Sequence, residues 1–127
     1  MRKKRDLLIS PFILTGMLLL LTFSCKKDDS DNTTAQVPVL TTTAVSNITF
    51  ATATCGGNIS SNGGAPVTAR GVCWSTGQTP TVSDSKTADG TGTGSFTSNI
   101  TGLTAVTPYY VRAYATNSAG TGYGSVM

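Results

Sequence analysis

Short stretches in which hydrophobic and polar residues alternate make up most of the chain after residue 37. The clearest stretch runs from Tyr109 to Thr116, and a turn-forming sequence follows it at 117–120. Such alternation is typical of a strand with one buried face, and no window shows the period of about 3.6 residues that marks a helix. The two faces of this strand differ: one carries Tyr109, Val111, Ala113 and Ala115, and the other carries Tyr110, Arg112 and Tyr114.

Similar but shorter stretches precede and follow this strand, and turn-forming residues separate them. The sequence from Ser60 to Gly64 is a strong turn signal, because its glycines adopt positive φ angles without steric cost. Several short strands at this spacing, without a helix, predict an all-β fold. The expected architecture is a small antiparallel β-sandwich whose closing strand is short or truncated. The further strands are expected at 37–41, at 51–55 with an end near 56–59, at 67–74, at 86–88, at 95–100 and from Thr121 onward.

A different pattern opens the chain. The basic residues at 2–5 are followed by a hydrophobic run of 17 residues, Leu7–Phe23, which Pro11 and Gly16 interrupt. A basic start, a hydrophobic run and a small residue at the break in hydrophobicity are the parts of a secretory signal peptide. The run is also close to the length that spans a hydrocarbon layer of about 30 Å, so an uncleaved anchor helix stays open as the alternative.

Cys25 stands where the hydrophobic run gives way to the charged sequence at 26–31. This arrangement resembles a bacterial lipoprotein signal, in which the cysteine thiol is acylated and the chain is cut just before it. The resemblance implies that Cys25 is the lipid attachment site, that residues 1–24 are a signal peptide, and that a flexible tether at 25–36 leads to a domain at 37–127. The lysines followed by aspartates also resemble the signals of surface-exported lipoproteins in some gram-negative bacteria.

Charge and composition narrow the function classes. The formal net charge is +3, but four basic residues lie at 2–5, and from Cys25 onward five basic residues balance five aspartates. A neutral domain offers no basic surface to nucleic acid, so no nucleic-acid partner is expected. The chain has no histidine and no glutamate, and its aspartates after Cys25 lie in tether and loop segments. We therefore expect no enzyme activity, no cofactor and no metal site.

Cys55 and Cys73 are candidates for a disulfide, because they lie in neighbouring predicted strands of a chain expected to be exported. Such a bridge would close a loop of about 19 residues and contribute about 3 kcal/mol through loop-closure entropy. The alternation opposes it. If Val72 and Trp74 face the core, Cys73 faces outward, whereas Cys55 faces inward with Ala53. A disulfide and two separate thiols both remain open at this point.

The residues Tyr110, Arg112 and Tyr114, together with Trp74, form a candidate ligand surface. Aromatic rings stack on sugar rings and an arginine donates hydrogen bonds to sugar hydroxyls, so a glycan is one ligand class. The alternative is ordinary packing, with Trp74 in the core and the outward row in cross-strand and cation–π contacts. The sequence favours packing, because exposed patches on small domains are functional when they are contiguous and large.

A more specific pattern surrounds the clearest strand. Leu103, Thr107 and Tyr109 precede it, and it closes in the pattern Ala-x-Asn-x-x-Gly. Together with CGGNISSNGG at 55–64 and RGVCWST at 70–76, this resembles a fibronectin type III-like repeat found in surface lipoproteins of gram-negative bacteria. The resemblance implies a fibronectin type III or immunoglobulin-like sandwich. It also implies a tyrosine corner, in which the Tyr109 hydroxyl bonds to upstream backbone.

These observations lead to one interpretation and one alternative. We expect a non-catalytic module that is lipid-anchored in the outer membrane, faces the cell exterior, and acts as a spacer or as an adhesion or glycan-binding domain. Its partners would be the membrane, through the lipid, and a glycan or another surface protein. In the alternative, the chain is a structural repeat of a longer multidomain surface protein, whose function lies in sequence beyond Met127. A fold class does not choose between these two.

Overall fold

The computed structural model describes residues 34–127, in which every regular element is a β-strand. Residues Ala35–Met127 form one compact unit. The predicted all-β fold class is confirmed. The strands are β1 (Val39–Thr42), β2 (Ala53–Ser61), β3 (Ala69–Ser75), β4 (Ser85–Lys86), β5 (Gly94–Ile100), β6 (Tyr110–Asn117) and β7 (Gly120–Tyr123).

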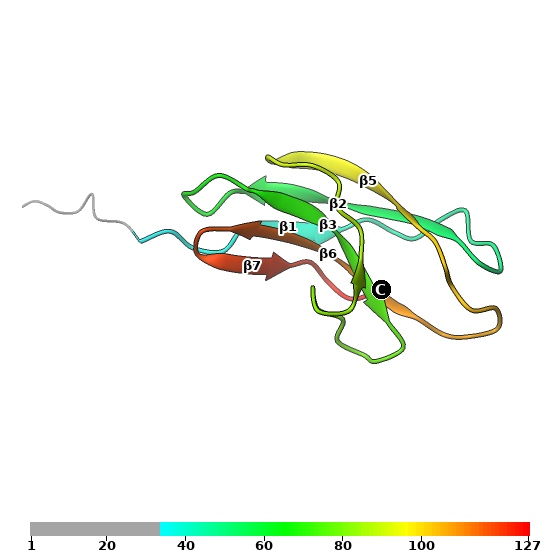
Figure 1. Cartoon of the computed structure of the whole chain (residues 1–127). Coiled ribbons are helices and arrows are strands. Elements are labelled where there is room, and N and C mark those ends of the chain that lie inside the picture. Colours follow the sequence, from blue (N-terminus) through cyan, green and yellow to red (C-terminus); the bar gives the residue numbers. More distant parts are fainter. Residues whose placement is uncertain (1–33) are drawn as a thin grey trace, which may run out of the picture. The chain divides into compact units, whose positions relative to one another are not determined.

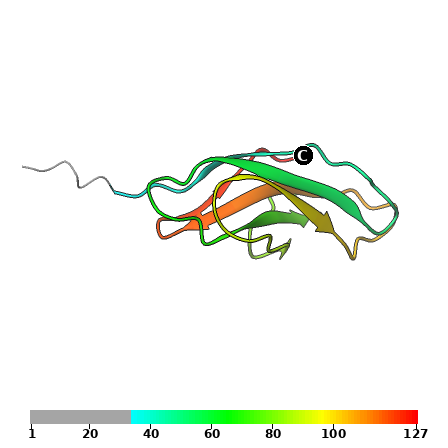
Figure 2. The same ribbon diagram turned by 90° about the horizontal axis from the view of Figure 1, so that it is seen from above.

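Two antiparallel sheets pack face to face as a small β-sandwich (Figure 1). One sheet has three strands in the order β1-β2-β5, and the other has four in the order β4-β3-β6-β7. Gly57 of β2 pairs with Phe96 of β5, and Val72 of β3 pairs with Ala113 of β6. Figure 2 shows the strands of both sheets running lengthwise, with their connections at the two ends. The closing strand β7 has only four residues, as the sequence predicted.

Small residues face each other between the two sheets at Gly57 and Ala113. A β-carbon built on Gly57 would lie 2.7 Å from the β-carbon of Ala113 and 2.8 Å from the carbonyl oxygen of Thr41, so only glycine fits there. The sequence predicts that this strand ends near 56–59, whereas β2 runs through these residues to Ser61. Glycine inside a strand here marks a close approach of two backbones and not a turn.

The strand β1 closes one side of the sandwich and faces inward with Leu40 and Thr42. Val39 is 58% exposed, whereas Leu40 and Thr42 are buried. The Thr42 hydroxyl accepts a hydrogen bond of 3.0 Å from the backbone N–H of Ala113, in the opposite sheet. The polar Thr42 is therefore buried with its hydroxyl satisfied, as a buried polar group requires. The valines at 37 and 39 suggested a strand correctly but did not show which face it buries.

A polar network closes the other side of the sandwich, between β5 and the segment that follows β4. The carboxylate of Asp89 accepts a hydrogen bond of 2.6 Å from the Thr87 hydroxyl and another from the Ser98 hydroxyl. The Ser98 side chain is fully buried in β5. The Arg70 guanidinium donates to the carbonyl oxygen of Asp89 at 3.1 Å and lies over the ring of Phe96. This network ties the long connection after β4 to both sheets.

The predicted signal peptide at 1–24, the lipid attachment site Cys25 and most of the predicted tether at 25–36 lie outside the described residues. Residues 34–127 contain no helix that is long and hydrophobic enough to cross a membrane. The compact unit begins close to the predicted domain start at residue 37, because Gln36 already joins it. Its backbone N–H donates a hydrogen bond of 2.8 Å to the carbonyl oxygen of Gly63.

Candidate functional site

Two loops and the C-terminal residues meet at one end of the sandwich, which we call the loop end. The loop at 43–52 joins β1 to β2, and the loop at 101–109 joins β5 to β6. They are linked by a hydrogen bond of 3.0 Å from the N–H of Leu103 to the carbonyl oxygen of Ala51. Met127 lies beside them, because its backbone pairs with the second residue of β6. The loop end is thus built from three segments that are distant in the sequence.

The chain enters the sandwich at the opposite end. There, Gln36 lies against the turn between β2 and β3 and against the turn between β6 and β7 (Figure 1). Its carbonyl oxygen accepts a hydrogen bond of 2.7 Å from the side-chain amide of Asn117, and the same amide donates 2.7 Å to the carbonyl oxygen of Asn62. These bonds hold the point of entry at the end of the domain away from the two loops.

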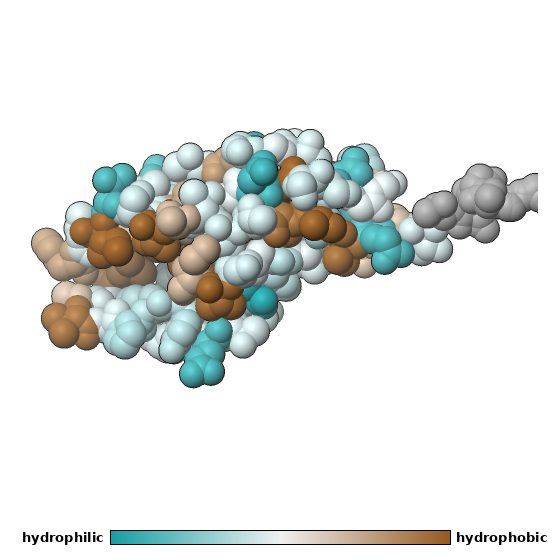
Figure 3. All heavy atoms as spheres, turned by 180° about the vertical axis from the view of Figure 1, so that it is seen from behind, coloured by the Kyte–Doolittle hydropathy of each residue, from teal (hydrophilic) through white to brown (hydrophobic). Residues whose placement is uncertain are grey.

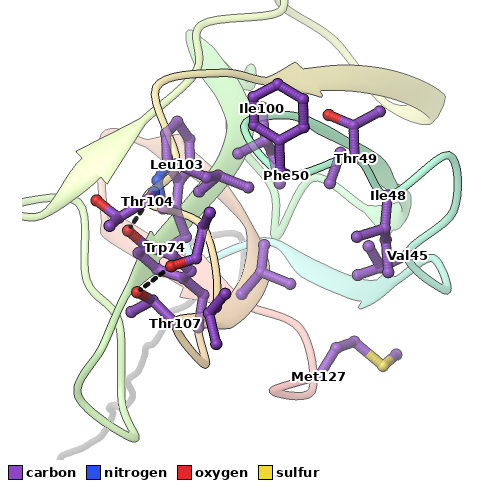
Figure 4. A pocket seen from close by; sticks show the side chains of 15 residues that line it. Val45, Ile48, Thr49, Phe50, Trp74, Ile100, Leu103, Thr104, Thr107 and Met127 are labelled. Carbon is purple, nitrogen blue, oxygen red and sulfur yellow. Dashed lines mark hydrogen bonds between the residues drawn. The ribbon is translucent and has the colours of Figure 1, made fainter.

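A pocket of about 360 Å³ opens at the loop end (Figure 4). Its inner wall is the edge of the core, and Trp74, the single tryptophan of the chain, forms part of it. This volume lies in the usual range for ligand pockets, and it exceeds the roughly 150 Å³ that holds a benzene molecule. The lining residues are Val45, Ile48, Thr49, Phe50, Ala53, Trp74, Ile100, Leu103, Thr104, Ala105, Val106, Thr107, Tyr109, Val111 and Met127.

Large hydrophobic side chains on the rim of this pocket stand in solvent. The exposed fractions are 71% for Ile48, 80% for Phe50 and 104% for Val106. Figure 3 shows hydrophobic residues gathered at this end of the domain. Val106 has a φ of 56°, which is a strained conformation for a β-branched residue. The unusual backbone conformation and the exposed hydrophobic side chains beside one pocket make the loop end the candidate interaction surface of this domain.

The polar groups of the pocket already have partners within the domain. The Thr49 hydroxyl bonds to the Thr52 hydroxyl at 2.7 Å, and the Thr107 hydroxyl donates 3.1 Å to the carbonyl oxygen of Ala105. No charged residue lines the pocket. The described residues also contain no group of three His, Cys, Asp or Glu side chains that could hold a metal ion. The pocket is therefore suited to hydrophobic, uncharged groups.

Tyr109 stands at the edge of the pocket, immediately before β6. Its hydroxyl accepts a hydrogen bond of 3.0 Å from the backbone N–H of Thr104, five residues upstream. This is the bond to upstream backbone that the sequence led us to expect of Tyr109. Hydrogen bonding from Thr104 also lowers the pKa of the Tyr109 hydroxyl. The bond holds the loop at 101–109 against the start of β6 and so fixes one wall of the pocket.

The candidate ligand surface at Tyr110, Arg112 and Tyr114 is not an open platform. Tyr114 is only 2% exposed, and its hydroxyl donates a hydrogen bond of 2.6 Å to the carbonyl oxygen of Thr87. Burial, and then the negative charge of Asp89, raise the pKa of the Tyr114 hydroxyl. The packing alternative is therefore the correct one for Tyr114, because the segment after β4 folds back over this face of the sheet.

Arg112 is held in the same layer of packing. Its guanidinium donates a hydrogen bond of 2.6 Å to the carbonyl oxygen of Pro80 and lies 3.8 Å from the ring centre of Tyr123. The predicted cation–π contact thus exists, but with Tyr123 of β7 as its partner. The Tyr123 hydroxyl in turn accepts a hydrogen bond from the N–H of Val82 at 3.1 Å. Of the three candidate residues, Tyr110 alone keeps a partly exposed side chain without such a cover.

The candidate disulfide between Cys55 and Cys73 is absent, and both cysteines are free and buried. Cys55 belongs to the core, where its thiol donates to the carbonyl oxygen of Thr43 at 3.2 Å. Cys73 lies on the outer face of its sheet, because its neighbours Val72 and Trp74 face the core. One sheet therefore separates the two thiols, as the alternation indicated. Burial raises the pKa of both thiols, and for Cys73 nearby Arg112 partly offsets this.

Alkylation of residues 35–127 should find two thiols. In denaturant without reductant we expect both Cys55 and Cys73 to be labelled, and in the folded domain we expect labelling to be slow. Both thiols are buried, and their raised pKa keeps them protonated at neutral pH. Arg112→Ala removes the positive charge that lowers the pKa of Cys73, so it should shift the pH dependence of Cys73 labelling to higher pH and leave that of Cys55 unchanged. Mass spectrometry of the adducts provides the measurement, and labelling that requires prior reduction would contradict two free thiols.

The pocket was not predicted from the sequence. Ile48 and Phe50 lie in a segment with neither alternation nor charge, and Val106 lies in a short connection. Loop residues of this domain can be buried, as Val67 is, so hydrophobic residues in a loop did not by themselves indicate an exposed patch. The sequence alone does not bring the loops at 43–52 and 101–109 together.

Comparison with models of known protein families finds no match, and comparison with curated proteins finds no significantly similar sequence. The function of this chain is therefore argued from its own geometry.

Proposed function

We propose that this protein is a lipid-anchored, non-catalytic module of the bacterial cell envelope, in which the single β-sandwich serves as a spacer that carries an adhesion surface. The hydrophobic run before Cys25 and the charged segment after it support the anchor. A chain without histidine or glutamate lacks the side chains most often used for acid–base catalysis, which supports a binding role. The outer membrane, facing the cell exterior, is the proposed location.

One observation supports the adhesion role: the chain joins the domain at one end, and exposed hydrophobic side chains lie at the other end. Gln36 fixes the point of entry, whereas Ile48, Phe50 and Val106 stand exposed at the loop end. A tether attached at Gln36 would leave the loop end free to meet a partner. The buried Tyr114 leaves no aromatic row for stacking on a sugar, so the adhesion surface is assigned to the loop end and not to a glycan platform.

We also propose that the domain is a fibronectin type III-like sandwich. Two observations support this proposal. The strands form a three-stranded and a four-stranded antiparallel sheet, and the Tyr109 hydroxyl bonds to the backbone of Thr104 ahead of β6. The fold positions the loop end but does not by itself name a ligand.

The anchor is tested by fatty-acid labelling of the full chain in a gram-negative host. We expect radiolabelled palmitate in the wild-type protein and no label in Cys25→Ser, which should leave the membrane fraction. Cys73→Ala is the matched control, because Cys73 is buried in the domain and should not carry lipid. Retention of label in Cys25→Ser, or a mature protein that still begins at Met1, would overturn the lipid anchor.

A further inference from the structure

We propose that the loop end binds the loop end of a second copy of this chain, so that two domains meet tip to tip. Each copy would place Phe50 in the pocket of the other, beside Trp74 and Leu103. This inference gives the proposed adhesion role a partner. It rests on that role and not on the lipid anchor.

The shape of the loop end selects among occupants. A flat bilayer would cover the exposed tips of Ile48, Phe50 and Val106 but would leave the pocket of about 360 Å³ unfilled. A small hydrophobic molecule would fill the pocket but leave those tips in water. A protein surface with a projecting hydrophobic side chain satisfies both, since it fills the void and covers the rim.

The same patch supplies both the hollow and the projection. Phe50 is 80% exposed at the rim, and a phenylalanine ring is smaller than the pocket, because a cavity of roughly 150 Å³ already holds benzene. A two-fold symmetric contact requires such a self-complementary surface, in which each residue meets its counterpart's neighbours. The strained φ of 56° at Val106 keeps a further hydrophobic side chain turned outward on this patch.

No charged side chain opposes this contact. A patch with like charges would repel its own copy, whereas neither the loop at 43–52 nor the loop at 101–109 contains a charged residue. The hydroxyls of Thr49 and Thr107 already have partners within each copy, so burial of this surface leaves them satisfied. The surface therefore combines exposed hydrophobic side chains with two threonine hydroxyls that already have partners.

The arrangement would join two opposing surfaces. Because the chain enters at the end away from the loops, a tip-to-tip pair has its two points of entry at its far ends. Two tethered copies that meet in this way would link two membranes. Part of the pocket lining, including Ala53, Ile100 and Val111, is buried in the core, so the contact has fewer residues than the roughly 20–30 of a standard interface. A single contact should therefore be weak, roughly between micromolar and millimolar in dissociation constant.

Sedimentation of residues 35–127 over a concentration series tests the contact, because this unit contains every described strand and the whole core. We expect a monomer at low concentration and a dimer at high concentration. Phe50→Ser should weaken the dimer by about tenfold or more. Val39→Ser is the matched control, because Val39 is also an exposed hydrophobic residue, in β1 outside the pocket, and its replacement should leave the dimer unchanged.

Fluorescence gives a second readout at the site itself. Trp74 is the single tryptophan and lines the pocket, so its emission should shift to shorter wavelength as the wild type dimerises, and not in Phe50→Ser. Circular dichroism checks that the variants are folded. We expect them to fold, because the substituted residues are exposed. A monomer at every concentration would overturn the proposal. So would a dimer unaffected by both Phe50→Ser and Val106→Asp, which would place the contact on another surface.

Two further arms separate the rival occupants. Binding of one Nile red molecule per chain without dimerisation would make the pocket a small-molecule site and overturn the proposal. Cosedimentation with neutral phosphatidylcholine vesicles, lost in Phe50→Ser, would do the same in favour of a bilayer. Beads that carry residues 35–127 through the N-terminus should aggregate through many weak contacts, and beads with Phe50→Ser should not. This result does not depend on Cys25, so failure of the lipid anchor and failure of the contact are distinguishable.

Discussion

Replacing Gly57 with alanine is expected to lower the free energy of unfolding by about 3 kcal/mol or more. The new β-carbon would lie 2.7 Å from the β-carbon of Ala113 and 2.8 Å from the carbonyl oxygen of Thr41. Neither group can rotate away, because one is fixed to the backbone and the other belongs to it. Overpacking of a filled core costs about 1–3 kcal/mol and occasionally more, and this site has no free space.

The matched control for this substitution is Gly77→Ala. A β-carbon at Gly77 would meet only the Ser75 hydroxyl, at an ordinary 3.6 Å, and Gly77 does not have a positive φ. Thermal unfolding of residues 35–127 is the measurement. We expect a loss in Tm of roughly 10 °C or more for Gly57→Ala and little change for Gly77→Ala. Similar Tm values for the two variants would show that the sheets can separate locally, against the close contact described here.

Removal of the Asp89 carboxylate should have the next largest effect, a loss of about 2–3 kcal/mol in the free energy of unfolding. Asp89→Ala deletes the acceptor for the Thr87 and Ser98 hydroxyls, and Ser98 is fully buried. Hydrogen bonds to a charged acceptor contribute about 1.5–3 kcal/mol, and a buried hydroxyl that loses its partner keeps its desolvation cost. Thr87 and Ser98 still contact each other at 3.2 Å, which limits the loss.

The control for Asp89 is the other carboxylate of the described residues, Asp84. Its side chain is exposed and accepts one hydrogen bond of 2.8 Å from the N–H of Thr81. Asp84→Ala should therefore cost less than Asp89→Ala in urea unfolding. Asp89→Asn should recover part of the loss, because its amide oxygen still accepts hydrogen bonds. If Asp84→Ala proved as harmful as Asp89→Ala, the network between the sheets would not be what closes this side of the sandwich.

The sequence predicted the strands because each one alternates or ends at a recognisable turn. The strand β6 is the clearest case: its faces were predicted correctly, with Val111, Ala113 and Ala115 in the core. The resemblance led us to expect the bond made by the Tyr109 hydroxyl, which the structure contains. Prediction failed where a local signal has two meanings. The glycines at 56 and 57 were read as a strand end, although they belong to the middle of β2.

For the candidate site, too, the sequence predicted the local features correctly but not the tertiary contacts. Tyr110, Arg112 and Tyr114 were placed correctly on the outward face of their strand, but that face is covered, because the segment after β4 folds back onto it. The sequence gives the direction of a side chain within a strand, since that direction follows from the backbone. It does not give what lies above that side chain, which depends on the path of another segment.

The chain by itself thus determined the all-β composition, the turns and the separation of Cys55 from Cys73 onto different faces, because all of these follow from local periodicity. Only the tertiary structure decided which outward side chains are covered and where hydrophobic surface is left over. The pocket at the loop end needs two loops, 43–52 and 101–109, that are separated by 48 residues in the sequence. Their meeting results from the packing of two sheets, a long-range event that no short window of sequence contains.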